Sequence, residues 1–124
     1  MTLVIFIDDS ETALASTKMV TSSMPIEVKQ YTQAEVALAE IQAGMTPDLI
    51  ITDLNMPVMN GFEFLQGLRQ IPSTKRTPCL MLTTETKDEM KQKGKALGLT
   101  GWIVKPFSPT QLKQAITRVL RLPA

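Results

Sequence analysis

The sequence predicts an α/β fold in which a parallel sheet of about five strands lies between two layers of helices. Short runs of branched apolar residues alternate with amphipathic helical patterns from one end of the 124-residue chain to the other. Strands that are joined through helices lie parallel, and a parallel sheet needs helices on both of its faces. Because this length suits a single core, we expect one three-layered, doubly wound domain.

The first half of the chain carries three expected strands and two expected helices. The strands are Leu3–Ile7, the alternating edge strand Ile26–Tyr31, and Leu49–Thr52. The helix expected over Glu11–Met24 has its inward face at Ala13, Thr17, Val20 and Met24. A capping box at Thr32–Glu35 predicts the start of the second helix, and Gly44 is suited to end it.

The second half continues the alternation with three helices and two strands. Helices are expected to start at Asn60–Glu63, at a second capping box over Thr86–Glu89, and at Ser108–Gln111; Pro72 and Gly98 end the first two. The strands are Cys79–Leu82 and Trp102–Val104. The last helix turns Leu112, Ala115, Ile116, Val119 and Leu120 inward. We therefore expect residues 1–124 to form one domain with no output domain after it.

Composition and charge exclude several classes of function. A net charge of +1 argues against nucleic acid held by electrostatics alone, and the absence of histidine argues against a zinc site. A single cysteine, Cys79, cannot form an internal disulfide. The N-terminal apolar run is too short for a signal peptide or a membrane span. We expect a cytoplasmic protein without nucleic-acid or membrane partners.

Two of the expected strands end in carboxylates. Asp8 and Asp9 follow the first strand, and Asp53 follows the third. Ligands of open parallel sheets bind beyond the carboxyl ends of the strands, so the three side chains converge if these strands are neighbours. Two like charges about 4 Å apart repel by roughly 4 kcal/mol at an effective dielectric near 20. A hard divalent cation among the oxygens, Mg²⁺ or Mn²⁺, would relieve that repulsion.

Two further polar side chains also follow strands of the expected sheet. Lys105 comes directly after the fifth strand and Thr83 after the fourth. A carboxylate nucleophile, a metal, a fixed cation and a hydroxyl are the parts needed to accept a phosphoryl group. Each residue alone also has a structural interpretation, such as Asp9 capping the helix that follows it. Their joint placement at successive strand ends is what favours phosphoryl transfer.

The motifs FIDDS, ITDLNMPVMNGFEFL, MLTTE and GWIVKPF resemble, in order and separation, those of the receiver domains of two-component response regulators. The resemblance covers essentially the whole chain. It implies a flavodoxin-like sheet with strand order 2-1-3-4-5. It also implies a phosphoacceptor signalling protein that promotes only its own phosphorylation and dephosphorylation and is not otherwise an enzyme.

The resemblance assigns a role to each candidate residue. Asp53 would take the phosphoryl group from a histidine kinase. Asp9, Asp53 and the backbone carbonyl of Asn55 would bind Mg²⁺, with Asp8 acting through a metal-bound water. Lys105 and Thr83 would contact the phosphoryl group, and the Lys105–Pro106 peptide bond would be cis.

Activation in such domains is a population shift, which the resemblance maps onto this chain. Thr83 would move toward the phosphoryl group, and Trp102 would swing inward, although an indole needs more room than the usual tyrosine or phenylalanine. The face made by the fourth helix, the fifth strand and the last helix would then bind a partner. Asn55 and Glu85 would tune dephosphorylation, and Thr84 would narrow access to the phosphoryl group.

Several functions remain open at this point. The leading one is a stand-alone, monomeric receiver in chemotaxis, with the flagellar motor switch as its partner. A second is a receiver that relays or drains phosphoryl groups. From another class, a Mg²⁺-dependent phosphatase would use Asp8 as its aspartyl nucleophile. A flavin-binding module is disfavoured, because Asp8 and Asp9 would repel its phosphate.

Overall fold

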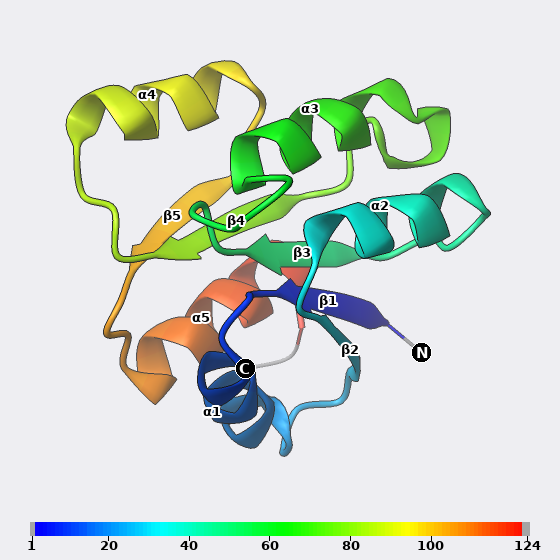
Figure 1. Ribbon diagram of the computed structural model, residues 1–124. Coiled ribbons are helices and arrows are strands. Elements are labelled where there is room, and N and C mark those ends of the chain that lie inside the picture. Colours follow the sequence, from blue (N-terminus) through cyan, green and yellow to red (C-terminus); the bar gives the residue numbers. More distant parts are fainter. Residues whose placement is uncertain (1, 123–124) are drawn as a thin grey trace.

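The computed structural model, which describes residues 2–122, is a five-stranded parallel sheet covered by helices on both faces (Figure 1). The strands are β1 (Leu3–Ile7), β2 (Glu27–Tyr31), β3 (Leu49–Thr52), β4 (Cys79–Thr83) and β5 (Gly101–Val104). Their order across the sheet is β2-β1-β3-β4-β5, and every neighbouring pair is parallel. The predicted α/β class, the flavodoxin-like strand order and the edge position of β2 are thereby confirmed.

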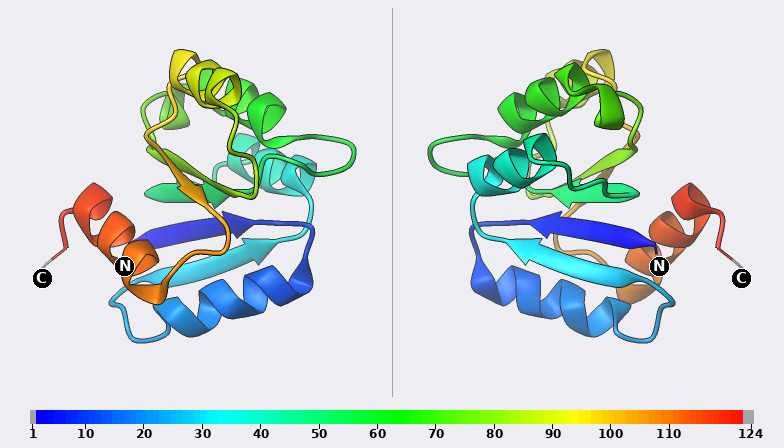
Figure 2. Two further views of the ribbon diagram at one scale, coloured as in Figure 1. Left: turned by 90° about the vertical axis from the view of Figure 1, so that its left-hand side faces the viewer. Right: turned by 90° about the vertical axis from the view of Figure 1, so that its right-hand side faces the viewer.

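The helices divide between the two faces of the sheet, as the two side views show (Figure 2). They are α1 (Glu11–Thr21), α2 (Ala34–Gln42), α3 (Gly61–Gln70), the short 3₁₀ helix η1 (Pro72–Thr74), α4 (Asp88–Ala96) and α5 (Pro109–Leu120). Helices α1 and α5 lie together on one face, and α2, α3 and α4 cover the other. No helix within residues 2–122 is long and apolar enough to span a bilayer.

Each face of the sheet has its own apolar core, because successive side chains of a strand point to opposite faces. In β1, Ile5 and Ile7 pack toward α2 and α3, whereas Val4 and Phe6 pack toward α1 and α5. The central strands β1, β3 and β4 are almost entirely buried, while β2 alternates exposed and half-buried side chains. Burial on both faces holds the carboxyl ends of the central strands rigidly in place.

The first helix departs from its predicted bounds. It ends at Thr21, before the expected Met24, and its buried positions are Leu14, Thr17 and Thr21. The Thr21 hydroxyl donates back to the Thr17 carbonyl at 2.8 Å, and the residue before a proline, here Met24, is biased away from helix. The predicted inward face was therefore only partly right.

Two of the predicted capping boxes are wrong. The N-caps of α2 and α4 are Gln33 and Lys87, and neither side chain makes a capping hydrogen bond. At α4, the Glu85 side chain instead accepts from the Lys87 backbone N–H at 3.1 Å. The other helix starts were predicted correctly: Asn60 and Glu63 form a reciprocal capping box, and the Ser108 hydroxyl accepts from Gln111 N–H at 3.0 Å.

Candidate functional site: an acidic cluster at the carboxyl edge of the sheet

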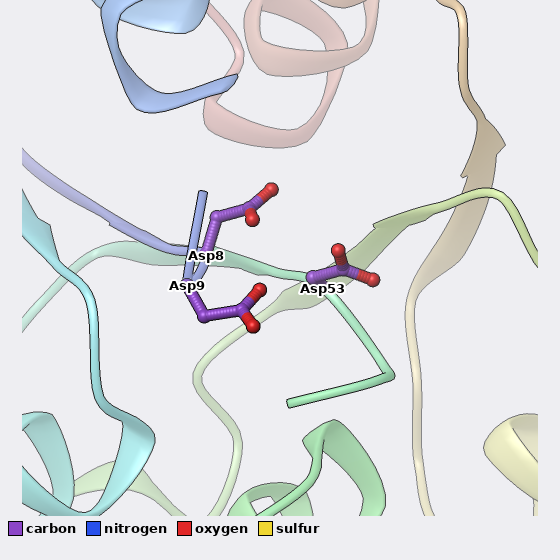
Figure 3. A group of neighbouring side chains, drawn as sticks. All are labelled: Asp8, Asp9 and Asp53. Atoms are coloured by element: carbon purple, nitrogen blue, oxygen red, sulfur yellow. The ribbon is translucent and has the colours of Figure 1, made fainter. Parts of the chain in front are cut away.

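The register of β1 and β3 brings the three predicted aspartates together. Ile7 pairs with Thr52, and Asp53 N–H donates to the Ile7 carbonyl at 2.9 Å. The next residue of each strand therefore starts a loop at the same edge of the sheet. One carboxylate oxygen from each of Asp8, Asp9 and Asp53 lies within 4.8 Å of the others, and Figure 3 shows the three side chains side by side.

Lys105 supplies the fixed positive charge of this cluster. Its Nζ donates to Asp8 Oδ2 at 2.5 Å and to Asp53 Oδ2 at 3.1 Å. Its backbone N–H donates to the Thr83 carbonyl at 2.8 Å, and the following bond to Pro106 is cis. Burial acts to lower the pKa of Lys105, but the hydrogen bonds and negative charges of Asp8 and Asp53 outweigh it, so this pKa is raised. Lys105 therefore stays an ammonium at neutral pH.

Backbone groups orient the carboxylates. Asp53 Oδ1 accepts from Leu54 N–H at 2.6 Å, which leaves Oδ2 for Lys105. Asp8 is buried, and its Oδ1 accepts from Ser10 N–H at 2.9 Å. The alternative that Asp9 caps α1 is wrong, because Ser10 is the cap and accepts from Ala13 N–H at 3.2 Å. Among the described residues, no hydrogen bond engages the exposed carboxylate of Asp9.

The donor set fits Mg²⁺ or Mn²⁺. All three side chains offer hard carboxylate oxygens, and three carboxylates against one lysine leave a formal charge of −2. A divalent cation balances that charge. The Asp9 carboxylate is exposed, whereas Asp8 and Asp53 each keep one oxygen on Lys105.

Thr83 lies at the same edge but is not hydrogen-bonded to the aspartates. It is the last residue of β4 and fully buried, and its hydroxyl accepts from Glu85 N–H at 3.4 Å. The next residue, Thr84, is exposed and lines a groove together with Lys105 and Pro106. The structure thus places Thr83 at the carboxyl end of β4, at the same edge as the aspartates, and Thr84 in a groove beside Lys105.

Trp102 connects β5 to the loop that leads from β4 to α4. Its half-buried indole donates from Nε1 to the Glu85 carbonyl at 2.9 Å. The ring packs against Phe62 at 6.5 Å between centroids, and both belong to an apolar cluster with Leu54 and Met81. Glu85 therefore touches both Thr83, through its N–H, and Trp102, through its carbonyl.

Gly61 is a site residue that the sequence analysis did not identify. A Cβ at this position would lie 2.6 Å from the Asp53 carbonyl oxygen and 3.0 Å from Leu54 Cα. The start of α3 therefore packs directly against the backbone of the acidic cluster. A glycine just after the predicted cap Asn60 was the available signal, since glycine often marks a close backbone approach.

The chain is similar to known proteins along most of its length. Residues 4–117 match the response regulator receiver domain family. The chain is 37% identical over 89 residues to the phosphate regulon transcriptional regulatory protein PhoB of Rhizobium meliloti, covering 72% of this chain and 37% of that protein. It is 38% identical over 72 residues to chemotaxis protein CheY-3 of Vibrio cholerae, covering 58% of this chain and 55% of that protein. The matches thus span between about a third and about half of these relatives' lengths.

Solved structures give a fuller match. The structure of Vibrio cholerae chemotaxis protein CheY4, crystallised at low pH, superposes with a TM-score of 0.90 at 45% sequence identity. That superposition covers 97% of this chain and 99% of the other. A response regulator receiver domain protein from Methanospirillum hungatei superposes with a TM-score of 0.89 at 25% identity.

Proposed function

The chain belongs to the family of response regulator receiver domains, and we propose that Asp53 takes a phosphoryl group from the phosphohistidine of a histidine kinase in a Mg²⁺-dependent reaction. A carboxylate oxygen of Asp53 attacks phosphorus, and the bond from phosphorus to the donor's imidazole nitrogen breaks, leaving its electron pair on that nitrogen. The observation that carries the proposal is the meeting of Asp53 with Asp8, Asp9 and Lys105 at one edge.

The neighbouring groups position the acceptor and balance its charge. The Leu54 N–H on Oδ1 fixes the orientation of the Asp53 carboxylate, and Lys105 is placed to pair with a phosphoryl oxygen. Asp9, Asp53 and the Asn55 backbone carbonyl would hold Mg²⁺, with Asp8 acting through water. When bound, the cation neutralises charge on the transferred phosphoryl group.

Thr83 and Trp102 would carry the change from this site to a partner surface. Thr83 donates its hydroxyl to the phosphoryl group, which shifts the β4–α4 loop that it shares with Glu85. The Glu85 carbonyl accepts a hydrogen bond from Trp102 Nε1. Movement of this loop therefore displaces the Trp102 side chain and, with it, the surface between β5 and α4. The face formed by α4, β5 and α5 then changes its population of binding-competent states.

The finer proposal is a chemotaxis receiver that docks on the flagellar motor switch, as a monomer. It is supported by the 45% identity to the Vibrio cholerae chemotaxis protein CheY4. Asn55 and Glu85 flank the phosphoryl position and set a short phosphate lifetime by placing the attacking water. Apart from this phosphorylation and dephosphorylation of itself, the domain catalyses no reaction.

A pull-down separates the possible partners. Immobilised protein is incubated with purified motor-switch protein or histidine phosphotransferase, in Mg²⁺ alone and in Mg²⁺ with beryllofluoride, which mimics phosphorylated Asp53. We expect motor-switch protein to be retained only with beryllofluoride, and the Asp53→Ala variant to retain none. Retention of the phosphotransferase alone would instead identify a relay or sink receiver.

A further inference from the structure

A fully buried hydroxyl lies one residue before the proposed phosphoacceptor. Thr52 is the last residue of β3, and its side chain is 0% exposed. A β-branched residue suits a central strand, but a hydroxyl withdrawn from water costs free energy unless it finds a hydrogen-bond partner. Thr52 Oγ1 donates to the Asp53 carbonyl at 2.9 Å, and within residues 2–122 this is the only hydrogen bond of that side chain. The hydroxyl is therefore tied to the backbone of the acceptor residue.

The Thr52 side chain lies on the face of the sheet that α2 and α3 cover. Thr52 pairs with Ile7 in the sheet, and paired residues of neighbouring strands point to the same face. Ile7 packs toward α2 and α3, so Thr52 points that way too. The Asp53 carbonyl is also close to α3, because a Cβ at Gly61 would lie 2.6 Å from its oxygen. Thr52 thus contacts the backbone of Asp53 and not its carboxylate.

One planar peptide group joins the Asp53 carbonyl to the Leu54 N–H. Because this group is rigid, a contact that fixes the direction of the carbonyl also fixes the direction of the N–H. The Leu54 N–H donates to Asp53 Oδ1 at 2.6 Å, while Oδ2 accepts from Lys105 at 3.1 Å. The Thr52 hydroxyl therefore acts on the acceptor carboxylate through two hydrogen bonds with a rigid peptide group between them.

We propose that Thr52 is a positioning residue for phosphorylation: its hydroxyl holds the peptide group between Asp53 and Leu54, and that group holds the Asp53 carboxylate in its reactive orientation. This inference rests on the proposed function for its link to phosphorylation. Rotation of the peptide group would withdraw the Leu54 N–H from Oδ1 and leave the carboxylate free to turn about its Cβ–Cγ bond. A nucleophile held in the reactive orientation attacks faster than one that rotates freely.

The neighbouring backbone groups are held by the main chain itself. The Asp53 N–H donates to the Ile7 carbonyl at 2.9 Å, and the Leu54 carbonyl accepts from the Gly61 N–H at 2.9 Å. In the part of the chain that the structure describes, no backbone N–H donates to the Asp53 carbonyl, so the Thr52 hydroxyl is the group that holds it. Valine has nearly the shape of threonine but lacks the hydroxyl, so Thr52→Val removes this one hydrogen bond and leaves the strand packing in place.

The rate of labelling by acetyl phosphate at saturating Mg²⁺ is the first test. Thr52→Val is expected to slow labelling about tenfold, whereas Thr52→Ser keeps the hydroxyl and should stay within about threefold of the wild type. Thr74→Val is the matched control. Thr74 is also 0% exposed and its hydroxyl donates to the Leu68 carbonyl at 2.8 Å, but it lies in η1, before β4 begins, at the opposite edge of the sheet. This control should label within about twofold of the wild-type rate.

The NMR signal of the Leu54 amide separates positioning from a general loss of stability. Without a phosphodonor, this amide proton should resonate far downfield, because it forms a short hydrogen bond to a carboxylate. Thr52→Val should move the signal upfield and speed its exchange with solvent by about tenfold or more, whereas Thr52→Ser and Thr74→Val should leave it unchanged. Thermal melts establish a temperature at which every variant is folded, and all measurements are made there.

Two results would overturn the proposal. One is labelling of Thr52→Val within about twofold of the wild type, or slowed no more than that of Thr74→Val. The other is an unchanged Leu54 amide signal in Thr52→Val, because the hydroxyl would then not act through this peptide group. Wild-type protein that is not labelled at all would count against the proposed function instead, and the Leu54 amide would still show whether Thr52 holds the peptide group.

Discussion

The acidic cluster and the α4–β5 pocket hold their charges in opposite ways. The α4–β5 pocket has a volume of about 230 Å³ and is lined by Lys91, Lys95, Leu99, Thr100, Gly101 and Trp102. At the cluster, Asp8 and Asp53 are largely buried and share one lysine, so the charges are paired and fixed in orientation. At the pocket, Lys91 and Lys95 stand at the solvent edge without an acidic residue between Met90 and Leu122. Paired, buried charges suit a small hard ion and a reaction, whereas unpaired, exposed charges suit attraction of a macromolecule.

Glu85 is the short connection between these two regions. Its backbone N–H donates to the Thr83 hydroxyl at 3.4 Å, and its carbonyl accepts from Trp102 at 2.9 Å. Any change that draws Thr83 toward Asp53 pulls on the residue that holds the indole. Changes in the cluster should therefore alter both phosphorylation and partner binding, while changes in the pocket should alter partner binding alone.

The largest effect is expected for Asp53→Asn. The amide cannot act as the acceptor, so labelling by acetyl phosphate in Mg²⁺ falls to background, while the circular dichroism spectrum stays that of the wild type. The matched control is Asp48→Asn, directly before β3 as Asp53 is directly after it, and this variant should label normally. Stoichiometric labelling of the Asp53→Asn variant would contradict the assignment of Asp53 as the phosphoacceptor.

Lys105→Met is expected to slow labelling by about 100-fold, because it removes the fixed cation that contacts the acceptor. Stopped-flow or rapid-quench labelling measures the rate. Lys113→Met removes the same charge from α5 and should leave the rate within about twofold of the wild type. An equal slowing in both variants would mean that overall charge matters, not the contact with Asp53.

Gly61→Ala is expected to lower the free energy of unfolding by about 1–3 kcal/mol, because the added Cβ meets backbone that cannot yield. Gly67→Ala is the matched control within α3. Its Cβ would meet only the end of the flexible Leu38 side chain, so repacking should limit the loss. Urea denaturation compares the two. A smaller loss for Gly61→Ala than for Gly67→Ala would contradict the close packing of α3 on the acidic cluster.

The smallest effect concerns the side chain of Tyr31, which bonds Glu40, although the Tyr31 backbone carbonyl accepts from Asp8 N–H at 3.0 Å. Burial, and then the hydrogen bond and charge of Glu40, raise its pKa from 10.0 to about 12. The folded state therefore holds this proton more tightly than the unfolded state, and the resulting stability is present below pH 10 and lost as the pH rises through about 12. Tyr31→Phe should show a shallower fall of unfolding free energy over that range. If the unfolding free energy of the two proteins fell with pH at the same slope, the raised pKa of Tyr31 would not be the cause of the fall.

The sequence predicted the architecture and the acidic cluster for a clear physical reason. The carboxyl ends of parallel strands lie at one edge of the sheet, so the pattern alone places Asp8 and Asp53 at that edge. That their strands are neighbours came from the strand order implied by the family resemblance, and the structure confirms it. Local capping was less predictable: Thr32 and Thr86 have suitable partners three residues later, yet the chain enters each helix one residue further on. The α4–β5 pocket could not be predicted, because it depends on which lysines of α4 the fold leaves facing β5.

The central claim is that Asp53 is phosphorylated, forming an acyl phosphate, within a cluster shared with Asp8 and Asp9. The most direct test is to label the protein with acetyl phosphate in Mg²⁺, reduce the acyl phosphate with borohydride, and locate the resulting homoserine by mass spectrometry. We expect the modified residue at position 53, and no labelling after removal of divalent cations with a chelator. Modification at position 8 would contradict the account and point to the aspartyl phosphatase class instead.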